Sequence, residues 1–169
     1  MKLAFEPLKK KHDRESFTSG EPALDDWFRK RALQDVKRNI SRVFVAMDEE
    51  GVAGFYSLSA FTIALASVPS DVAHKLPRYD ALPAALIGRL ARAERVRGQG
   101  IGELLLADAI KRVLAVDESM AIFAIVVDSK NESATTFYGS FGFSPFPDTP
   151  RRLFLLTATA RAAIFASTH

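Results

Sequence analysis

Between residues 84 and 116 a short strand, a glycine-rich turn and a helix follow one another, and this succession restricts the possible folds more than any other feature of the sequence. The strand is predicted at Ala84–Arg92 (AALIGRLAR), a short β-rich run. Glycines then stand at the alternate positions 98, 100 and 102. Behind them apolar residues repeat with helical spacing, at Ile101, Leu105, Ala109, Val113 and Val116. A strand that leads through a tight turn into an amphipathic helix is typical of α/β folds.

The remaining segments supply further strands and helices. Other β-rich runs lie at 2–8, 41–47, 52–66, 121–129 and 152–157, and the long run at 52–66 is expected to contain a bulge. Helical patterns lie at 22–38 and 131–141, with a short helix expected at the C-terminus. Thr18 or Ser19 is expected to cap the first helix, and residues 67–83, with three prolines, to form an irregular connection. We therefore expect one α/β domain over residues 1–169, with a central mixed, twisted sheet of about six to seven strands and helices on both faces.

The composition excludes several classes of function. The chain has 169 residues, 48% of them hydrophobic, and no cysteine, which rules out disulfides, thiolate metal sites and a cysteine nucleophile. The 23 basic side chains exceed the 20 acidic ones by three, which is compatible with a nucleic acid or an anionic ligand as partner. No apolar leader stands at the N-terminus, and no segment approaches the roughly 18 apolar residues that a membrane helix needs. A cytoplasmic protein without a membrane span is predicted.

The alternating glycines predict a site for a phosphate or pyrophosphate. Without Cβ atoms, successive backbone N–H groups can converge on one ligand, and the helix behind them adds its positive end. Glu103 excludes the two familiar alternatives, because a Walker loop needs Lys-Ser/Thr after its last glycine and a dinucleotide-binding fingerprint needs a third glycine at 103. The alternative is a turn that is merely tight. The flanking Arg95 and Arg97 favour anion binding.

The loop Arg97–Gly102 (RGQGIG) resembles the Gln/Arg-x-x-Gly-x-Gly/Ala signature of the GNAT superfamily of N-acetyltransferases. The order of elements, the buried strand at 121–129 and the segment NESATTFYGSFGF (131–143) fall where the GNAT fold has its counterparts. The resemblance implies that fold, acetyl-CoA as the co-substrate and no metal.

The resemblance also implies roles for individual residues. The pyrophosphate side would be formed by Arg97, Gly98, Gln99, Gly100, Ile101 and Gly102. Main-chain groups of Leu90, Ala91 and Arg92 would contact the pantetheine, and Asn131 and Phe137 would lie near the thioester. Tyr138 is the catalytic candidate.

A phenol at position 138 suits the chemistry of acetyl transfer. With a pKa near ~10, a tyrosine can donate a proton to the departing thiolate, whose thiol has a pKa near ~8.5. The alternative for Tyr138 is a packing role among its phenylalanine neighbours. No residue stands out as a general base, because His12, His74 and His169 are expected to be solvated. An α-amino group, with a pKa of ~7.7 to 8.0, is therefore an easier acceptor than a lysine amine near ~10.4.

A narrower resemblance points to the toxin-type GNATs of bacterial toxin–antitoxin pairs. It rests on FTSGEPALDDWFRKRA (17–32), SRVFVA (41–46), GFYSLS (54–59), IGRLA (87–91) and FYGSFGFSPFP (137–147). It implies acetylation of the α-amino group of aminoacyl-tRNA and a block of translation. It also implies a ribbon-helix-helix antitoxin as partner and a homodimer. Arg92 departs from the group, which often has an aliphatic residue there, and this puts the acceptor pocket in doubt.

Basic residues could contact the tRNA backbone under this interpretation. They are Lys9–Lys11, Arg29–Arg31, Lys37, Arg38, Arg151 and Arg152. Two other functions stay open at this point: an N-acetyltransferase for a free small amine such as a polyamine, amino acid or antibiotic, and a non-catalytic acyl-CoA-sensing or RNA-binding module.

Overall fold

The structure, a computed structural model, describes residues 2–168. Within this range the strands form a mixed seven-stranded sheet in the order β1-β2-β3-β4-β5-β7-β6. They are β1 (Ala4–Pro7), β2 (Arg42–Asp48), β3 (Gly51–Ala64), β4 (Ala81–Arg92), β5 (Ala124–Asp128), β6 (Ser144–Phe146) and β7 (Thr149–Leu156). The helices are α1 (Pro22–Lys30), α2 (Ala32–Lys37), α3 (Ser70–Ala73), α4 (Ile101–Asp117), α5 (Glu132–Ser140) and α6 (Thr157–Thr168), with 3-10 turns η1 (Leu65–Ser67) and η2 (Glu94–Val96). The α/β class and the expected number of strands are confirmed.

The chain divides into two compact units. The first unit consists of Met1–Ser59 and Ile87–Lys111, and the second of Ala60–Leu86 and Arg112–His169. Strands β3 and β4 and helix α4 each begin in one unit and end in the other. Neither unit is therefore a continuous stretch of sequence.

In the first unit, β1, β2 and β3 pair antiparallel. The β-rich runs at 41–47 and 52–66 form a hairpin: β2 ends at Asp48 and β3 begins at Gly51, whose φ of 124° lies in the left-handed region. Ala46 pairs with Gly54 and Met47 with Val52, so β3 has one extra residue at this point. This is the bulge expected in the long second run.

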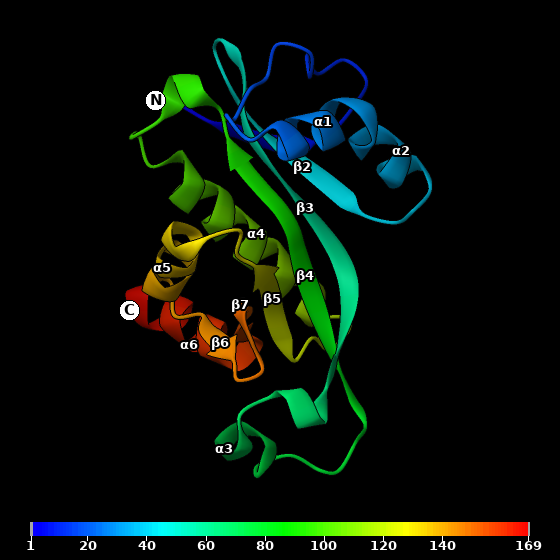
Figure 1. The fold of residues 1–169 in the computed structure, drawn as a ribbon, viewed down its shortest axis with the longest axis vertical. Coiled ribbons are helices and arrows are strands. Elements are labelled where there is room, and N and C mark those ends of the chain that lie inside the picture. The colour runs from blue at the N-terminus through cyan, green and yellow to red at the C-terminus, as the bar shows by residue number, and fades with distance from the viewer. Residues whose placement is uncertain (1, 169) are drawn as a thin grey trace. The chain divides into compact units, whose positions relative to one another are not determined.

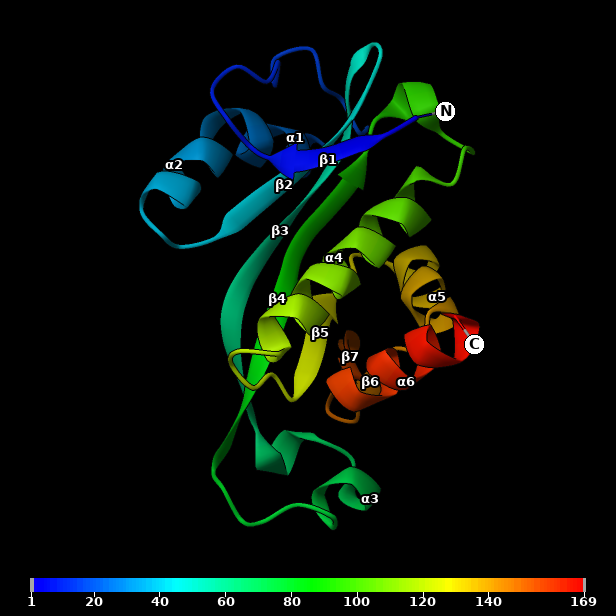
Figure 2. The same cartoon turned by 180° about the vertical axis from the view of Figure 1, so that it is seen from behind.

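Helices cover both faces of the sheet in the first unit, because consecutive residues of β3 point in opposite directions. Phe55 packs toward α1, where the Phe28 ring stacks on it at 4.2 Å with an interplanar angle of 3°. Tyr56 points the other way, and its hydroxyl donates to the carboxylate of Asp108 in α4. Figure 1 shows α1 and α2 in front of β2 and β3, and in Figure 2, seen from behind, α4 lies in front of β4.

The segment predicted as one helix at 22–38 is two helices. Arg31, with φ −123° and ψ −27°, separates α1 from α2. The expected capping is also reversed: the carboxylate of Asp25, inside the first turn, accepts from the N–H and the hydroxyl of Ser19 and from the hydroxyl of Thr18. The loop thus donates to the helix side chain, and Glu21 at the N-cap makes no side-chain cap.

In the second unit, β7 lies between β5 and β6 and pairs antiparallel with both. Asp128, the last residue of β5, is the register partner of Arg152. The three-residue strand β6 was not predicted. A buried apolar cluster lies among β3, β4 and the strands of this unit, formed by Ile63, Val68, Leu82, Ala84, Ala124, Val126, Phe146 and Phe154. No helix within residues 2–168 is both long enough and apolar enough to cross a bilayer.

Candidate active site

The glycine loop lies in the first unit, between η2 and α4. Gly98 and Gly100 have φ of 80° and 77°, a region in which other residues are strained, so glycine is required at both positions. The N–H of Arg97 donates to Glu94 O at 3.1 Å and that of Gln99 to Val96 O at 3.2 Å, which closes two successive turns. Gly102 lies in the first turn of α4.

The geometry of the loop is compatible with an anion such as a pyrophosphate. The first N–H groups of a helix have no hydrogen-bond partner within the helix and can bind an anion. In α4 the helical hydrogen bonds begin with Leu104, whose N–H donates to Gly100 O at 3.2 Å. A Cβ at Gly98 would meet no atom within 4 Å, so the space beside the backbone is open. Ile101 is 2% exposed, and only its backbone can reach a ligand. One feature opposes an anion: a Cβ at Gly100 would lie 3.4 Å from the carboxylate of Glu103.

Arg95 has a structural role that the sequence interpretation missed. Its guanidinium forms ion pairs with Asp48 at 2.7 Å and with Glu50 at 2.9 Å, across the loop between β2 and β3. These carboxylates raise the pKa of Arg95, and Arg95 in turn holds the pKa of Asp48 below its usual value. The charge that flanks the glycines is therefore that of Arg97, which is exposed.

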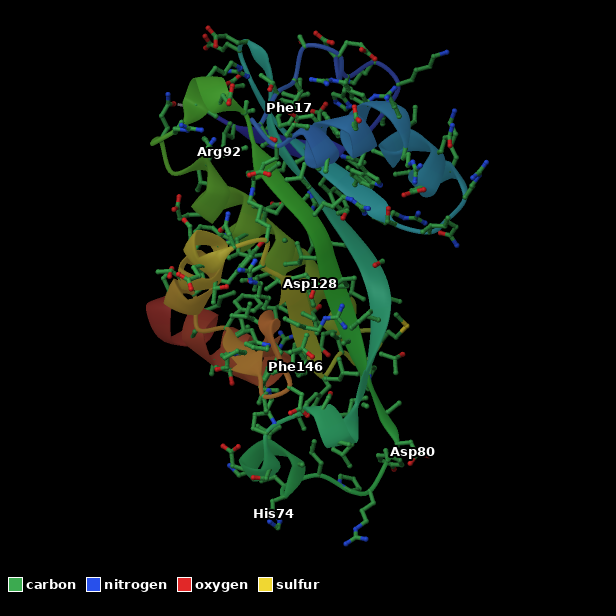
Figure 3. All side chains as sticks on the ribbon, in the orientation of Figure 1. Phe17, His74, Asp80, Arg92, Asp128 and Phe146 are labelled. Atoms are coloured by element: carbon green, nitrogen blue, oxygen red, sulfur yellow. The ribbon has the colours of Figure 1, made fainter. Side chains whose placement is uncertain are left out.

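The end of β4 offers backbone groups on one edge. The carbonyl of Ala91 faces β3, since a Cβ at Gly54 would lie 2.9 Å from it, and the N–H of Ala93 donates to Ala53 O at 2.8 Å. Because strand residues alternate in the direction of their N–H and C=O groups, those of Leu90 and Arg92 point away from β3. Of the three residues predicted to contact pantetheine, Leu90 and Arg92 have backbone groups able to do so, and Arg92 is labelled in Figure 3.

Tyr138 lies in α5 of the second unit and is 7% exposed. Its ring packs edge-on against Phe137 at 5.3 Å and against Phe143 at 5.8 Å. Burial, and second the charge of Asp128, raise the pKa of Tyr138 to about 12. The phenol thus carries its proton throughout the neutral range, and it is a weaker acid than the unperturbed tyrosine assumed from the sequence.

Asn131 and Phe137 already have structural roles in the same unit. The Oδ1 atom of Asn131 accepts from Ala134 N–H at 2.8 Å and caps α5, so its Nδ2 is the atom that could reach a ligand. Phe137 is half-buried against Tyr138 and Phe141. Both are compatible with the predicted positions near the thioester.

All three histidines were expected to be solvated, and this prediction is wrong for His12. His12 is buried, at 5% exposed, and not solvated: the N–H of Lys9 donates to its Nδ1 at 2.9 Å, and its Nε2 lies 2.5 Å from Glu6. The accepting Nδ1 puts the proton on Nε2, which donates to Glu6. His74 is exposed after α3 (Figure 3), and His169 lies outside the described residues. Among the described side chains, no group of three or more histidines, cysteines or carboxylates could hold a metal ion.

Several basic side chains predicted to face RNA have intramolecular partners. Arg29 donates to Phe17 O, and Arg151 donates to Lys130 O at 2.6 Å. Lys11 lies 3.8 Å from Glu6, and Lys30 lies 3.7 Å from Asp26. Arg152 pairs with Asp128. Of the basic residues predicted to face RNA, the exposed Lys9, Lys10, Arg31, Lys37 and Arg38 are those left to supply charge to a ligand.

Comparisons with known proteins give both a family match and a curated relative. Residues 39–145 match the model of a GNAT acetyltransferase domain. The chain is 41% identical over 149 residues to a tRNA-acetylating toxin of Mycobacterium tuberculosis, an alignment that covers 88% of this chain and 89% of the relative.

Two solved structures are similar over almost the whole chain. AtaT complexed with acetyl-methionyl-tRNAfMet has a TM-score of 0.89 and 28% identity, over 96% of this chain and 99% of that one. A tyrosine-to-phenylalanine mutant of AtaT, bound to the C-terminus of the antitoxin AtaR and acetyl-CoA, has a TM-score of 0.81 and 25% identity, over 96% and 98%.

Proposed function

Because this chain belongs to the GNAT acetyltransferase family, we propose that it transfers the acetyl group of acetyl-CoA to the α-amino group of aminoacyl-tRNA and thereby blocks translation. The observation that carries the proposal is the 41% identity to a tRNA-acetylating toxin over 88% of the chain. A modified α-amine can no longer accept a peptide chain. The protein is an acetyltransferase, and its acceptor is the proposed part.

The first unit would hold acetyl-CoA by its pyrophosphate and pantetheine. The N–H groups of Gly98, Gly100, Ile101 and Gly102 bind the pyrophosphate. Arg97 and Gln99, whose N–H groups already donate to Glu94 and Val96, contribute their side chains. Backbone groups of Leu90 and Arg92 bind the pantetheine amides, with Ala91 between them. In the second unit Asn131 and Phe137 contact the thioester end.

Tyr138 would act on the leaving sulfur. Acetyl-CoA supplies an activated thioester, and the acceptor amine displaces its thiolate. Tyr138 holds a proton at its phenol oxygen and donates a hydrogen bond to the sulfur as negative charge develops there. With a pKa of about 12, the phenol gives up this proton less readily than an unperturbed tyrosine, so its hydrogen bond is the main contribution.

An α-amine as acceptor is supported by the state of the carboxylate that acts on Tyr138: Asp128 is already paired with Arg152 and is therefore a poor base. The buried His12 belongs to the first unit and is bonded to Glu6 there. An α-amine with a pKa of ~7.7 to 8.0 is substantially neutral at physiological pH and needs no base. The exposed residues Lys9, Lys10, Arg31, Lys37 and Arg38 supply positive charge for an RNA backbone.

The same proposal includes the partners. The AtaT relative binds the C-terminus of its antitoxin, which supports a proteinaceous antitoxin for this chain. We infer one of the ribbon-helix-helix type, a homodimeric toxin, and action in the cytoplasm, where charged tRNA is found.

The test follows radiolabel from acetyl-CoA into RNA. Purified protein is incubated with labelled acetyl-CoA and total charged tRNA, beside uncharged tRNA and the Tyr138→Phe variant. Label that requires both aminoacylation and Tyr138 is the expected result. Turnover with free amines alone would contradict the proposal and assign a small-molecule acceptor.

A further inference from the structure

Three side chains of the second unit form a layered arrangement near Tyr138. Arg152 of β7 donates from Nε to Asp128 Oδ1 at 2.8 Å and from Nη2 to Oδ2 at 3.0 Å. The guanidinium carbon lies over the ring of Phe61, 4.9 Å from its centroid. Phe61 belongs to the end of β3, and Asp128 (labelled in Figure 3) ends β5.

These contacts hold the guanidinium in place without enclosing it. The two parallel hydrogen bonds restrict its orientation, and the aromatic ring covers one side. The Arg152 side chain is still 37% exposed, and the carboxylate that it bonds compensates its charge. A planar group of this kind is better suited to stacking on a flat ligand than to binding a phosphate.

The arrangement lies close enough to the proposed acid to be part of the same site. The charge of Asp128 contributes to the raised pKa of Tyr138, so the carboxylate acts on the phenol directly. The contacts of the next residue agree: the hydroxyl of Ser129 shares a hydrogen bond of 2.6 Å with that of Thr135, which lies one turn before Tyr138 in α5.

We infer that the Arg152 guanidinium, held over Phe61 by Asp128, is the platform on which the 3′-terminal base of the aminoacylated RNA stacks. The inference rests on the proposed function. The reacting α-amine is joined to the terminal ribose through one ester, so the base of that nucleoside must lie near Tyr138. Unpaired bases commonly stack on arginine planes and aromatic rings, which are already combined here.

The test compares two acceptors that differ only in the nucleoside. One is the 3′-O-aminoacyl ester of adenosine, made with the amino acid that is acetylated in total charged tRNA. The other is the methyl ester of the same amino acid. The ratio of their kcat/KM values is measured in the wild type and in Arg152→Ala, Arg152→Lys and Phe61→Leu. The matched control is Arg161→Ala, which removes a comparable ion pair with Asp117, 3.0 Å long, in the same unit.

The wild type is expected to favour the adenosine ester, and this preference should fall about ten-fold in Arg152→Ala, within the range reported for loss of one base stack. Arg152→Lys should lose it as well, because lysine keeps the charge but not the plane. Phe61→Leu should lose part of it, and Arg161→Ala none. Because the readout is the ratio of kcat/KM for the two acceptors, a loss of activity that affects both equally, for example through a displaced Tyr138, cancels.

Three results would overturn the platform. They are a wild type without preference for the adenosine ester, an unchanged preference in Arg152→Ala, and a preference retained in Arg152→Lys, which would indicate charge and not stacking. An increased KM for acetyl-CoA with an unchanged ratio would assign the surface to the adenine of the co-substrate instead. Failure of the proposed function is distinct, because the wild type would then acetylate neither charged tRNA nor the adenosine ester.

Discussion

The guanidinium of Arg95 bonds the carboxylate of Asp48 at both ends, from Nη1 to Oδ2 at 2.7 Å and from Nη2 to Oδ1 at 2.8 Å. The Asp48 side chain is only 7% exposed. The pair fastens the segment before the glycine loop to the hairpin of β2 and β3. Arg95 and Arg97, two residues apart, therefore have separate tasks, the first in folding and the second in binding.

Arg95→Ala and Arg97→Ala should separate these tasks. Arg95→Ala leaves Asp48 nearly buried without its partner, and we expect a loss of about 1–3 kcal/mol in the free energy of unfolding. Arg97→Ala, at an exposed position, should change it by less than about 0.5 kcal/mol but raise the KM for acetyl-CoA. Urea unfolding measures the free energy of unfolding of each variant, and steady-state kinetics measures its KM for acetyl-CoA. An Arg97→Ala variant with wild-type KM would remove this side chain from the binding site.

Gly100→Asp should abolish acetyl-CoA binding. The substitution adds a negative charge where we place the pyrophosphate, and strains a residue whose φ is 77°. Calorimetry measures the binding, and circular dichroism checks that α4 still forms. Gly51→Ala is the control for strain alone, since Gly51 also has a left-handed φ but belongs to the hairpin. Retained binding in Gly100→Asp would refute the assignment of the loop.

Glu103→Gln should strengthen acetyl-CoA binding. Its carboxylate lies beside Gly100 at the start of α4, where it repels an anion. Removing one such charge near the surface should lower the dissociation constant by about two- to five-fold, and the gain should shrink at high salt. Calorimetry in low and high salt tests this. Weaker binding in the variant would place the pyrophosphate elsewhere.

Tyr138→Phe should change how stability depends on alkaline pH. A tyrosine ionises near ~10 in the unfolded chain, but the pKa of Tyr138 is about 12 in the folded protein. The unfolded state therefore releases its proton first, and the folded state loses stability as the pH rises from about 10 to about 12. At 1.36 kcal/mol per pKa unit, the loss is about 3 kcal/mol.

The measurement is urea unfolding from pH 8 to 12 in both proteins. The difference between the wild type and Tyr138→Phe should be constant below about pH 9 and then change by about 2 kcal/mol up to pH 12, where half of the folded-state phenol is still protonated. Tyr79→Phe, at a tyrosine that is 65% exposed, removes a phenol that is not buried and is the control. Parallel profiles of the wild type and Tyr138→Phe would show that Tyr138 is not buried in the folded state.

The fold could be predicted from the sequence where periodicity was strong and local. The hairpin, its bulge and the strand at 124–128 follow from runs of β-branched and apolar residues, and α5 from the helical pattern at 131–141. Where two neighbouring elements share one pattern, prediction was less accurate. The apolar face of α1 continues into α2, so the break at Arg31 leaves no signal in the spacing.

Pairings between distant residues could not be predicted from spacing. Nothing near Arg95 in the sequence indicates Asp48 as its partner. From the sequence His12 was expected to be solvated, because only the folded structure shows its contact with Glu6. Val116 continues the helical spacing of α4 but is 44% exposed, because the buried face of α4 ends before it. In the second unit, the sequence signal that could have pointed to Asp128 as a site residue is its position: it is the acidic residue at the end of an otherwise uncharged strand.

The position of β7 in the sheet affects the order in which the second unit can form during synthesis. A ribosome adds Asp128 and α5 to the chain before it adds β7, which ends at Leu156, yet β7 is the strand that pairs with β5 and supplies Arg152 to Asp128. A nascent chain that stops earlier has the glycine loop but lacks the strand that completes the surroundings of Tyr138. An interrupted translation product would then be inert, and acetylation would begin only once nearly the whole chain had been made.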